Sequence, residues 1–205
     1  MPFRLACLVK RGAFSYNSAD RILRSGRPFL HPGEMIQALK ERRSIRHFKA
    51  EMPPKEVIDE IIEAGLYAPS SKGRQPTKIL VVTDQKLRAR LAEINRQFKP
   101  LPEGKDPFCG APLVLIVLAD KNVPTYLYDG SLTMGNLLNA THALGLGGVW
   151  IHRARQEFEA EDMKALLKEL GIEGEWEGIG NCAIGYIDGE VPQPAPRKEG
   201  RVFWL

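Results

Sequence analysis

Three arginines and one serine lie within five positions of one another, in the run ERRSIRHF that spans residues 41–48. A guanidinium group presents a planar fork of donors that matches phosphate oxygens in pairs, and the Ser44 hydroxyl adds one more donor. The same composition also occurs on ordinary solvated surfaces. Phosphate binding at this run therefore depends on what the rest of the chain offers.

A second polar segment, APSSKGRQP at residues 68–76, follows an apolar-periodic stretch and precedes a hydrophobic run. Loops at the ends of sheets often carry function. The alternative is a plain turn that stops a helix, because Pro69, Gly73 and Pro76 all break regular structure. Near the C-terminus, Arg197 and Lys198 follow a proline-rich stretch and could join residues 42–46 around one phosphate.

Several familiar motifs fail. Gly145-Leu146-Gly147-Gly148 lacks the third glycine of a dinucleotide fingerprint and precedes a strand instead of following one. Neither a Gly-x-Ser-x-Gly elbow nor a Walker-type lysine motif occurs. The four histidines, at positions 31, 47, 142 and 152, lack zinc-ligand spacing, so we expect no metal site.

The composition is that of a globular domain. A chain of 205 residues with 43% hydrophobic content can bury one full core. The longest apolar run, residues 112–119, is far shorter than the ~20 residues of a membrane-spanning helix. Three widely spaced cysteines suggest neither a disulfide framework nor a zinc site, so we expect a reducing, cytoplasmic location.

The basic charge is concentrated at one end. Residues 1–33 carry six Lys or Arg and one Asp, whereas residues 34–205 carry 23 basic and 24 acidic side chains. The body of the chain thus has no field that would attract a polyanion, and nucleic-acid binding is not expected. Residues 1–33 resemble a transit peptide or a flexible arm, or else reflect an upstream start codon, since regular patterning begins at Met35. We expect the folded domain to span residues 34–205.

The elements that would position these residues alternate along the chain. Apolar periodicity predicts helices near residues 35–39, 53–66, 87–98, 126–144 and 158–170. Short apolar runs predict strands at residues 79–82, 113–118, 147–151 and 179–187. This alternation indicates an α/β or α+β sheet sandwich.

Two features indicate a second subunit. The predicted helix 126–144 contains small or polar residues that permit close helix approach, namely Gly130, Gly135, Asn136, Asn139 and Thr141. The chain ends in the apolar segment 202–205, Val-Phe-Trp-Leu, and apolar ends normally dock somewhere. We favour docking on a second copy of the chain.

Together these segments resemble the nitroreductase family of FMN-dependent oxidoreductases from about Met35 to Leu205. The matching landmarks are RRSIRHF at 42–48, APSS at 68–71 with Gln75-Pro76, GLG at 145–147 leading into Trp150-Ile151, Ile184-Gly185-Tyr186, and Arg197-Lys198. The resemblance implies an α+β fold, an α/β/α sandwich whose central, mainly antiparallel sheet is flanked by helices. It also implies an intertwined homodimer with two FMN molecules at the subunit interface.

The resemblance further implies roles for particular residues. Those expected at the FMN phosphate and the pyrimidine edge of the flavin are Arg42, Arg43, Ser44 and Arg46, with Arg197 and Lys198 completing the phosphate site. Those expected to reach the flavin from the partner subunit are Pro69, Ser70, Ser71 and Gln75. Ile151 and His152 would flank the ring, with a backbone N–H facing the flavin N5 atom, and Asn95 aligns with an asparagine that some members place against the flavin.

The implied chemistry is hydride transfer from NAD(P)H to flavin N5 and then to an acceptor that stacks in the same place. Such ping-pong kinetics require no side-chain acid or base. A cation such as Arg46 near the pyrimidine edge would stabilise the reduced flavin. His152 could donate a proton to the reduced acceptor, or only its backbone could matter.

The chain departs from the family pattern at Gly73, where many members have asparagine, and at Thr77, where an aromatic residue is usual. We expect a reductase of small electrophiles such as nitroaromatics or quinones. Reductive dehalogenation or enone reduction is an alternative, with residues 101–108 as a candidate lid. Two further alternatives are a flavin-binding protein without turnover and a basic adaptor that uses residues 1–33 to bind an anionic surface.

Overall fold

The computed structural model describes residues 32–98, 101–102 and 104–205, and Gln37–Leu205 form one compact unit. The predicted extension 1–33 lies outside the described residues except for its last two positions. The helices are α2 (Pro32–Glu41), α3 (Lys55–Leu66), α4 (Gln85–Phe98), α5 (Tyr126–Ala143), α6 (Ala154–Glu159) and α7 (Glu161–Glu169), with a short 3-10 turn, η1 (Ser71–Gly73). The strands are β1 (Thr77–Val82), β2 (Leu113–Asp120), β3 (Gly147–Ile151) and β4 (Trp176–Gly185).

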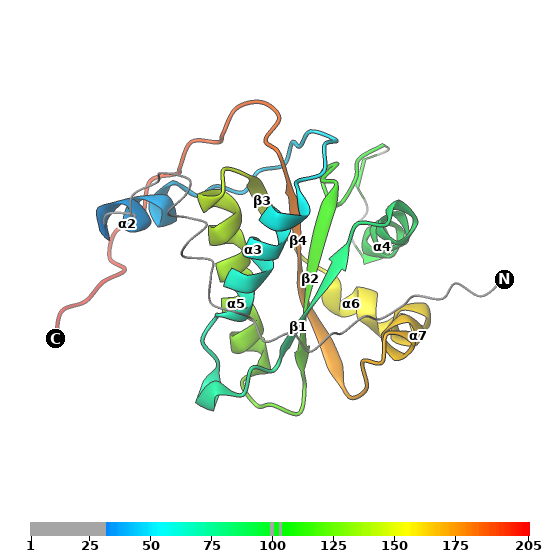
Figure 1. Ribbon diagram of the computed structural model, residues 1–205. Coiled ribbons are helices and arrows are strands. Elements are labelled where there is room, and N and C mark those ends of the chain that lie inside the picture. The colour runs from blue at the N-terminus through cyan, green and yellow to red at the C-terminus, as the bar shows by residue number, and fades with distance from the viewer. Residues whose placement is uncertain (1–31, 99–100, 103) are drawn as a thin grey trace. The chain divides into compact units, whose positions relative to one another are not determined.

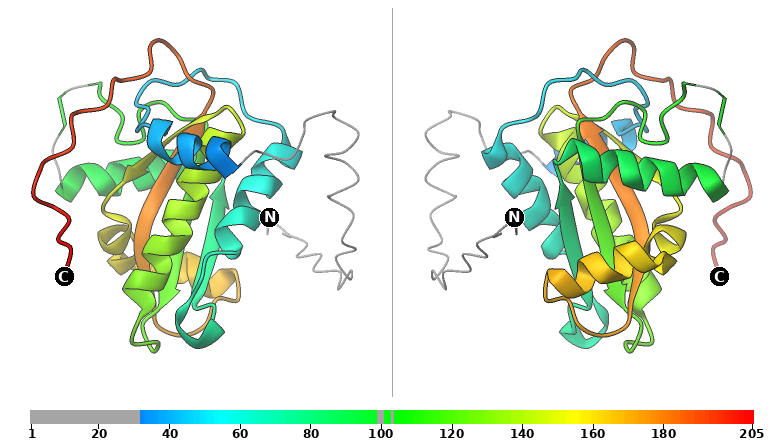
Figure 2. Two further views of the ribbon diagram at one scale, coloured as in Figure 1. Left: turned by 90° about the vertical axis from the view of Figure 1, so that its left-hand side faces the viewer. Right: turned by 90° about the vertical axis from the view of Figure 1, so that its right-hand side faces the viewer.

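The four strands form one antiparallel sheet in the order β1-β2-β4-β3 (Figure 1). Helices α3 and α5 cover one face, and α4, α6 and α7 cover the other (Figure 2). The predicted α+β sandwich with a central antiparallel sheet flanked by helices is therefore confirmed. The intertwined homodimer remains a prediction.

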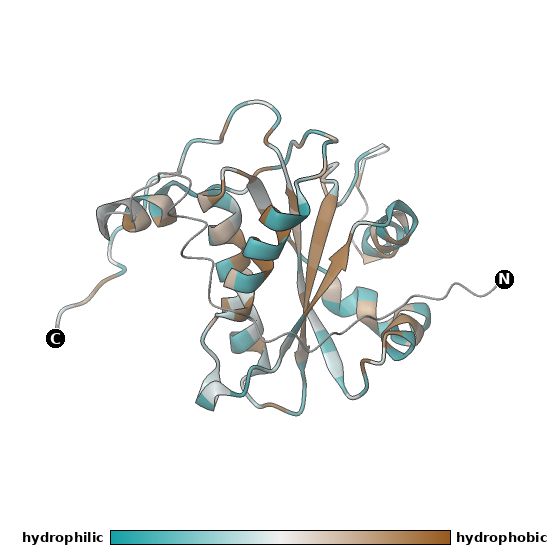
Figure 3. Cartoon of the chain, in the orientation of Figure 1, coloured by the Kyte–Doolittle hydropathy of each residue, from teal (hydrophilic) through white to brown (hydrophobic). Residues whose placement is uncertain are grey.

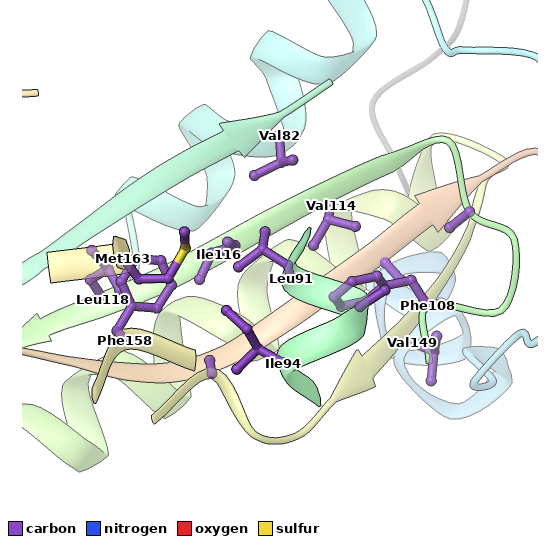
Figure 4. Close-up of a cluster of buried hydrophobic side chains, with 14 of the residues drawn as sticks. Val82, Leu91, Ile94, Phe108, Val114, Ile116, Leu118, Val149, Phe158 and Met163 are labelled. Carbon is purple, nitrogen blue, oxygen red and sulfur yellow. The ribbon is translucent and has the colours of Figure 1, made fainter. Parts of the chain in front are cut away.

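Strand β2 is buried on both faces because it lies between β1 and β4 under two helical layers. Its residues 114, 116 and 118 contribute to the core beneath α4 and α6, and residues 113, 115, 117 and 119 to the core beneath α3 and α5. This explains why β2 reads as a continuous apolar run and not as an alternating one. Figure 3 shows the hydrophobic strand β2 between helices whose outer surfaces are polar. Figure 4 is a close-up of the core beneath α4 and α6.

One predicted helix is divided in two. The expected helix 158–170 is interrupted at Ala160, whose extended backbone (φ −70°, ψ 138°) ends α6 and begins α7. On one continuous helix, Phe158 and Met163 would point about 140° apart. Both are buried in the same core, and the break allows this. In the described part of the chain, no helix is long and apolar enough to cross a membrane.

Candidate functional site

The arginine-rich segment is fixed at the edge of the sheet. Ser44 forms an isolated parallel bridge with Gly148 of β3, and the Ile45 N–H donates to the Gly148 carbonyl at 3.2 Å. Further along, Phe48 bridges Ile187 in the antiparallel sense. The segment is thus held between the start of β3 and the chain that leaves β4.

Glycine makes this close approach possible. Ile45 is only 4% exposed, and a Cβ atom added to Gly147 would lie 2.9 Å from the Ile45 side chain. A Cβ at Gly148 would meet Thr141 of α5 at 3.2 Å. The glycines of the run 145–148, which do not form a dinucleotide fingerprint, therefore admit the arginine segment against β3.

Two guanidinium groups of this segment have buried nitrogens without partners. Arg42 Nη1 and Arg43 Nε are inaccessible to solvent and receive no hydrogen-bond acceptor from the described residues. Arg43 otherwise donates to the carbonyl oxygens of Lys40 and Arg42, each at 2.7 Å. A buried cationic donor without an acceptor is costly. The arrangement suits an added anion.

Arg42 faces the interior, and Arg46 faces outward. Burial raises the pKa of the Cys182 thiol to about 12, and the positive charge of Arg42 opposes this rise. Arg46 is exposed and exerts the same opposing effect on Cys109, whose pKa burial also raises. The two cations of the segment thus point to different surroundings.

A first hollow, of about 180 Å³, opens beside this segment. Its lining comprises Ser44, Ile45, Arg46 and His47 on one side and Asp188, Glu190 and Pro192 on the other. The two acidic side chains form no ion pair with Arg46 in the described structure. The hollow is therefore of mixed charge.

A second hollow, of about 140 Å³, contains the other polar segment. It is lined by Leu66, Ala68, Pro69, Ser70, Gln75, Thr77, Asp129 and Thr133. Pro69, Ser70 and Gln75, three of the four residues expected to meet a flavin from a partner subunit, thus lie together, and Ser71 follows directly. Ser70 fixes the loop internally, because its Oγ accepts the Gln75 N–H at 2.9 Å.

Asp129 anchors this loop, and sequence reasoning missed it. It is 4% exposed in the first turn of α5 and accepts the Ser71 N–H at 3.0 Å and the Thr125 hydroxyl at 2.8 Å. A carboxylate in the first turn of a helix is also favoured by the helix dipole. The sequence shows an acidic residue at the start of a long helix, but it does not show that this residue hydrogen-bonds to a loop 58 positions away.

The loop has a strained backbone. Lys72 (φ 55°) and Gln75 (φ 48°) adopt left-handed conformations that non-glycine residues rarely occupy. Gly73 (φ 64°) lies between them, and a Cβ there would meet nothing within 4 Å. Glycine at position 73, where many family members have asparagine, thus leaves open space. At Thr77, the other position that departs from the family pattern, the hydroxyl lies 3.3 Å from the Thr133 hydroxyl.

The two hollows lie at opposite ends of the sheet. At one end, Ser44 pairs with Gly148 of β3, and Gly148 pairs with Ile184 of β4. Ile184 in turn pairs with Leu113, the first residue of β2. At the other end, the Asp120 N–H donates to the Pro76 carbonyl. The length of β2, about 23 Å for seven residue steps, separates them, and Figure 1 shows η1 far from the segment that follows α2.

The remaining predicted residues lie elsewhere. Ile151 ends β3 half-buried against the core, and the His152 side chain is exposed. Arg197 and Lys198 are exposed, and Arg197 donates to the Ala195 carbonyl. In the described structure neither joins residues 42–46 through a hydrogen bond or ion pair. Among the described residues, no cluster of His, Cys, Asp or Glu could hold a metal.

A buried polar cluster behind Ile151 and His152 also escaped sequence reasoning. Glu157 of α6 is fully buried and accepts hydrogen bonds from Asn95 of α4 (2.6 Å) and Asn181 of β4 (2.9 Å). The Asn95 amide also donates to the His152 carbonyl at 2.9 Å. Asn95, expected against a flavin, directs its amide NH2 group into this cluster.

Comparison with known proteins supports the resemblance drawn from the sequence. The model of the Nitroreductase family matches residues 39–186. The chain belongs to the nitroreductase family. The arginine segment, the Pro-Ser-Ser loop and the β3 edge all fall within the matched region.

Individual nitroreductase-family relatives agree. An FMN-dependent nitroreductase structure from Clostridium difficile R20291 is 30% identical, with a TM-score of 0.68, covering 82% of this chain and 98% of that chain. A protein of Methanothermobacter thermautotrophicus, provisionally named NADH dehydrogenase/NAD(P)H nitroreductase, is 32% identical over 57% of this chain and 60% of its own length. The iodotyrosine deiodinase of Thermotoga neapolitana is 28% identical over 78% of this chain and 91% of its own.

Proposed function

We propose that this protein is an FMN-dependent oxidoreductase that uses NAD(P)H to reduce a small electrophile such as a nitroaromatic or a quinone. The observation that carries the proposal is the pair of buried, unpartnered guanidinium nitrogens on Arg42 and Arg43, which directly precede Ser44 in the chain. A phosphate monoester would supply the missing acceptors. The relatives named as FMN-dependent nitroreductase and as NAD(P)H nitroreductase support this cofactor and this donor.

The residues present fit FMN in a definite way. Asp188 and Glu190 would repel a phosphate from the first hollow, which favours Arg42 and Arg43 for that group. Arg46 is left to face the flavin ring edge, where a cation would stabilise a reduced, anionic flavin. When bound, FMN would supply hydride transfer. Arg197 and Lys198 lie on an exposed tail and would complete the phosphate site only after that tail docks.

We propose a homodimer because one chain separates the two parts of the expected site. The Arg42–Arg46 segment and the Pro69–Gln75 loop lie at opposite ends of β2, so a flavin that touches both needs a second copy. Apolar side chains that this copy could cover are exposed on the outer surfaces, namely Leu66, Tyr67, Leu127, Tyr128, Leu132, Val202, Phe203, Trp204 and Leu205. Covering these side chains would remove their apolar surface from water and so favour association.

The side chains around the expected flavin position need not transfer protons. His152 is exposed and its carbonyl already accepts the Asn95 amide. We propose ping-pong kinetics, in which the donor leaves before the acceptor binds.

The free thiols of Cys109 and Cys182 fit a reducing cytoplasm.

A second candidate is reductive dehalogenation on the same flavin. The match to an iodotyrosine deiodinase over 91% of that protein's length favours it. Turnover assays with a nitroaromatic, a quinone and a halogenated phenol, each under saturating donor, would separate the two activities. A halophenol consumed with release of halide, with no reduction of the other acceptors, would select the dehalogenase.

The decisive experiment is an absorption spectrum of the purified protein, recorded before and after anaerobic addition of NADPH or NADH. We expect a yellow protein that bleaches and releases FMN on heating. A protein that acquires no flavin absorbance when FMN is supplied would refute the proposal. A protein that keeps FMN but never bleaches with either donor would instead be a flavin-binding protein without turnover.

A further inference from the structure

Glu157 holds two successive peptide groups at the end of β3. Its backbone N–H donates to the Arg153 carbonyl at 3.0 Å. Its carboxylate accepts the Asn95 amide, which in turn donates to the His152 carbonyl at 2.9 Å. One residue thus fixes the carbonyl on each side of the Arg153 Cα atom.

The backbone so fixed is strained. Arg153 has φ 88°, a left-handed conformation that is uncommon outside glycine and that persists only where its surroundings enforce it. The peptide between His152 and Arg153 is trans, so its N–H points opposite to its C=O. Because Asn95 draws the C=O into the core, the Arg153 N–H points outward.

No described residue accepts a hydrogen bond from this N–H. It lies next to Ile151 and His152, the residues expected to flank the flavin ring. A fixed backbone donor that faces a reacting atom stabilises the charge that develops there without reorganisation.

We propose that Glu157, acting through Asn95, is a positioning residue that presents the Arg153 N–H to the flavin and couples this donor to the protonation of a buried carboxyl group. The proposal rests on the proposed function, since the flavin supplies the acceptor.

The carboxyl group can change state near neutral pH. Burial raises the pKa of Glu157 to about 7, against the lowering effect of the Asn95 and Asn181 hydrogen bonds. Above this pH the carboxylate accepts from both amides. Below it, the added proton needs an acceptor, and the Asn181 Oδ1 atom is buried without a partner. Rotation of that amide would supply the acceptor and rearrange the cluster.

Charged groups on the neighbouring elements are engaged elsewhere. On α4, Arg88 binds Asp106 and Arg90 binds Asp162 of α7. Two further groups near the cluster are also engaged or turned away. On β4, Glu177 accepts from the Tyr126 hydroxyl, and His152, which directly follows β3, is exposed. Among the described residues, Asn95 and Asn181 are the side chains that hydrogen-bond to the carboxyl group.

The test compares full-length wild type with Glu157→Gln, and with Glu159→Gln as a matched control on the exposed side of α6. In the first part, the backbone amide resonance of Arg153 is followed by NMR from pH 5.5 to 8.5 without flavin. We expect it to titrate with a midpoint near pH 7 in wild type and in the control, and to stay constant in Glu157→Gln. An amide that titrates alike in all three proteins would overturn the proposal.

The second part uses the same proteins loaded with oxidised, 15N-labelled FMN, whose ring does not itself titrate in this range. We expect the N5 resonance to move toward its hydrogen-bonded position as the pH rises through about 7, in wild type and the control only. An N5 resonance that does not change with pH in wild type would refute the coupling. If the Arg153 amide titrates but no FMN binds, the proposed function is wrong, whereas the coupling between Glu157 and the Arg153 N–H is supported.

A second variant covers the case in which Glu157→Gln does not fold. Asn95→Ala keeps the carboxyl group but removes the amide that joins it to the His152 carbonyl, including the hydrogen bond from that amide to the carboxylate. We expect it to abolish the pH response of flavin N5 and to weaken that hydrogen bond at every pH. A wild-type N5 titration in Asn95→Ala would contradict the proposal.

Discussion

Arg42 shows how far a single residue could be understood from the sequence. Its type and spacing predicted an anion-binding role, and the structure adds that one of its nitrogens is buried without a partner. The anchoring of its segment by Ile45 against Gly147 was not predictable, because it depends on a contact across 102 positions.

Replacing Arg42 by alanine should weaken FMN binding by about 1.5–3 kcal/mol, the range for hydrogen bonds to charged groups. Arg197→Ala should do the same if the C-terminal tail completes the phosphate site. Arg201→Ala, on the same exposed tail, is the matched control. Fluorescence titration of flavin-free protein with FMN measures the effect, and unchanged affinity in both variants would refute the phosphate assignment.

Asp129 offers a residue-scale test of the other half of the site. Asp129→Asn removes the charge that strengthens the hydrogen bonds from Ser71 and Thr125. A loss of about 1 kcal/mol in holding the loop should weaken FMN binding about fivefold. Asp59→Asn, an exposed change on α3, should have no effect in the same titration. Equal affinities for the two variants would mean that Asp129 does not set the loop for binding.

At the scale of elements, periodicity predicted almost every helix and strand, because 3.6-residue and two-residue patterns are local. It did not predict the break at Ala160, which arises because Phe158 and Met163 must enter one core. Nor could it predict the Asn95–Glu157–Asn181 cluster, which joins α4, α6 and β4 through hydrogen bonds between residues 24 and 62 positions apart.

This cluster makes the stability of the fold depend on pH. The folded pKa of Glu157 lies above its unfolded value, near 4.5, so the folded state holds this proton more tightly. The contribution is favourable below about pH 4.5 and is lost as the pH rises to about 7. Glu157→Gln cannot ionise and should gain on the order of 3 kcal/mol over wild type across that window.

Urea denaturation at intervals from pH 4.5 to 8 measures this difference. Glu159→Gln, which is exposed, should follow the wild-type curve. A constant difference between Glu157→Gln and wild type at every pH would show that folding does not raise the pKa of Glu157.

At the scale of the whole molecule, the C-terminal segment 202–205 has no partner in the described chain, and Trp204 is 95% exposed. Burial of one such aromatic side chain is worth about 1.5–3 kcal/mol. Deleting these four residues should therefore raise the dimer dissociation constant by at least about tenfold. Sedimentation equilibrium with and without FMN measures this, and undiminished dimerisation would exclude docking of the tail on a second copy.

Because the two hollows lie at opposite ends of one chain, a dimeric enzyme would assemble each site from two different polypeptides. Two defective forms of the protein could then rescue each other. In a mixed dimer of Arg42→Ala and Asp129→Ala subunits, one site carries both lesions and the other carries none. Random pairing should restore about a quarter of all sites to wild-type affinity, so a mixture of the two forms would contain high-affinity sites that neither form provides alone.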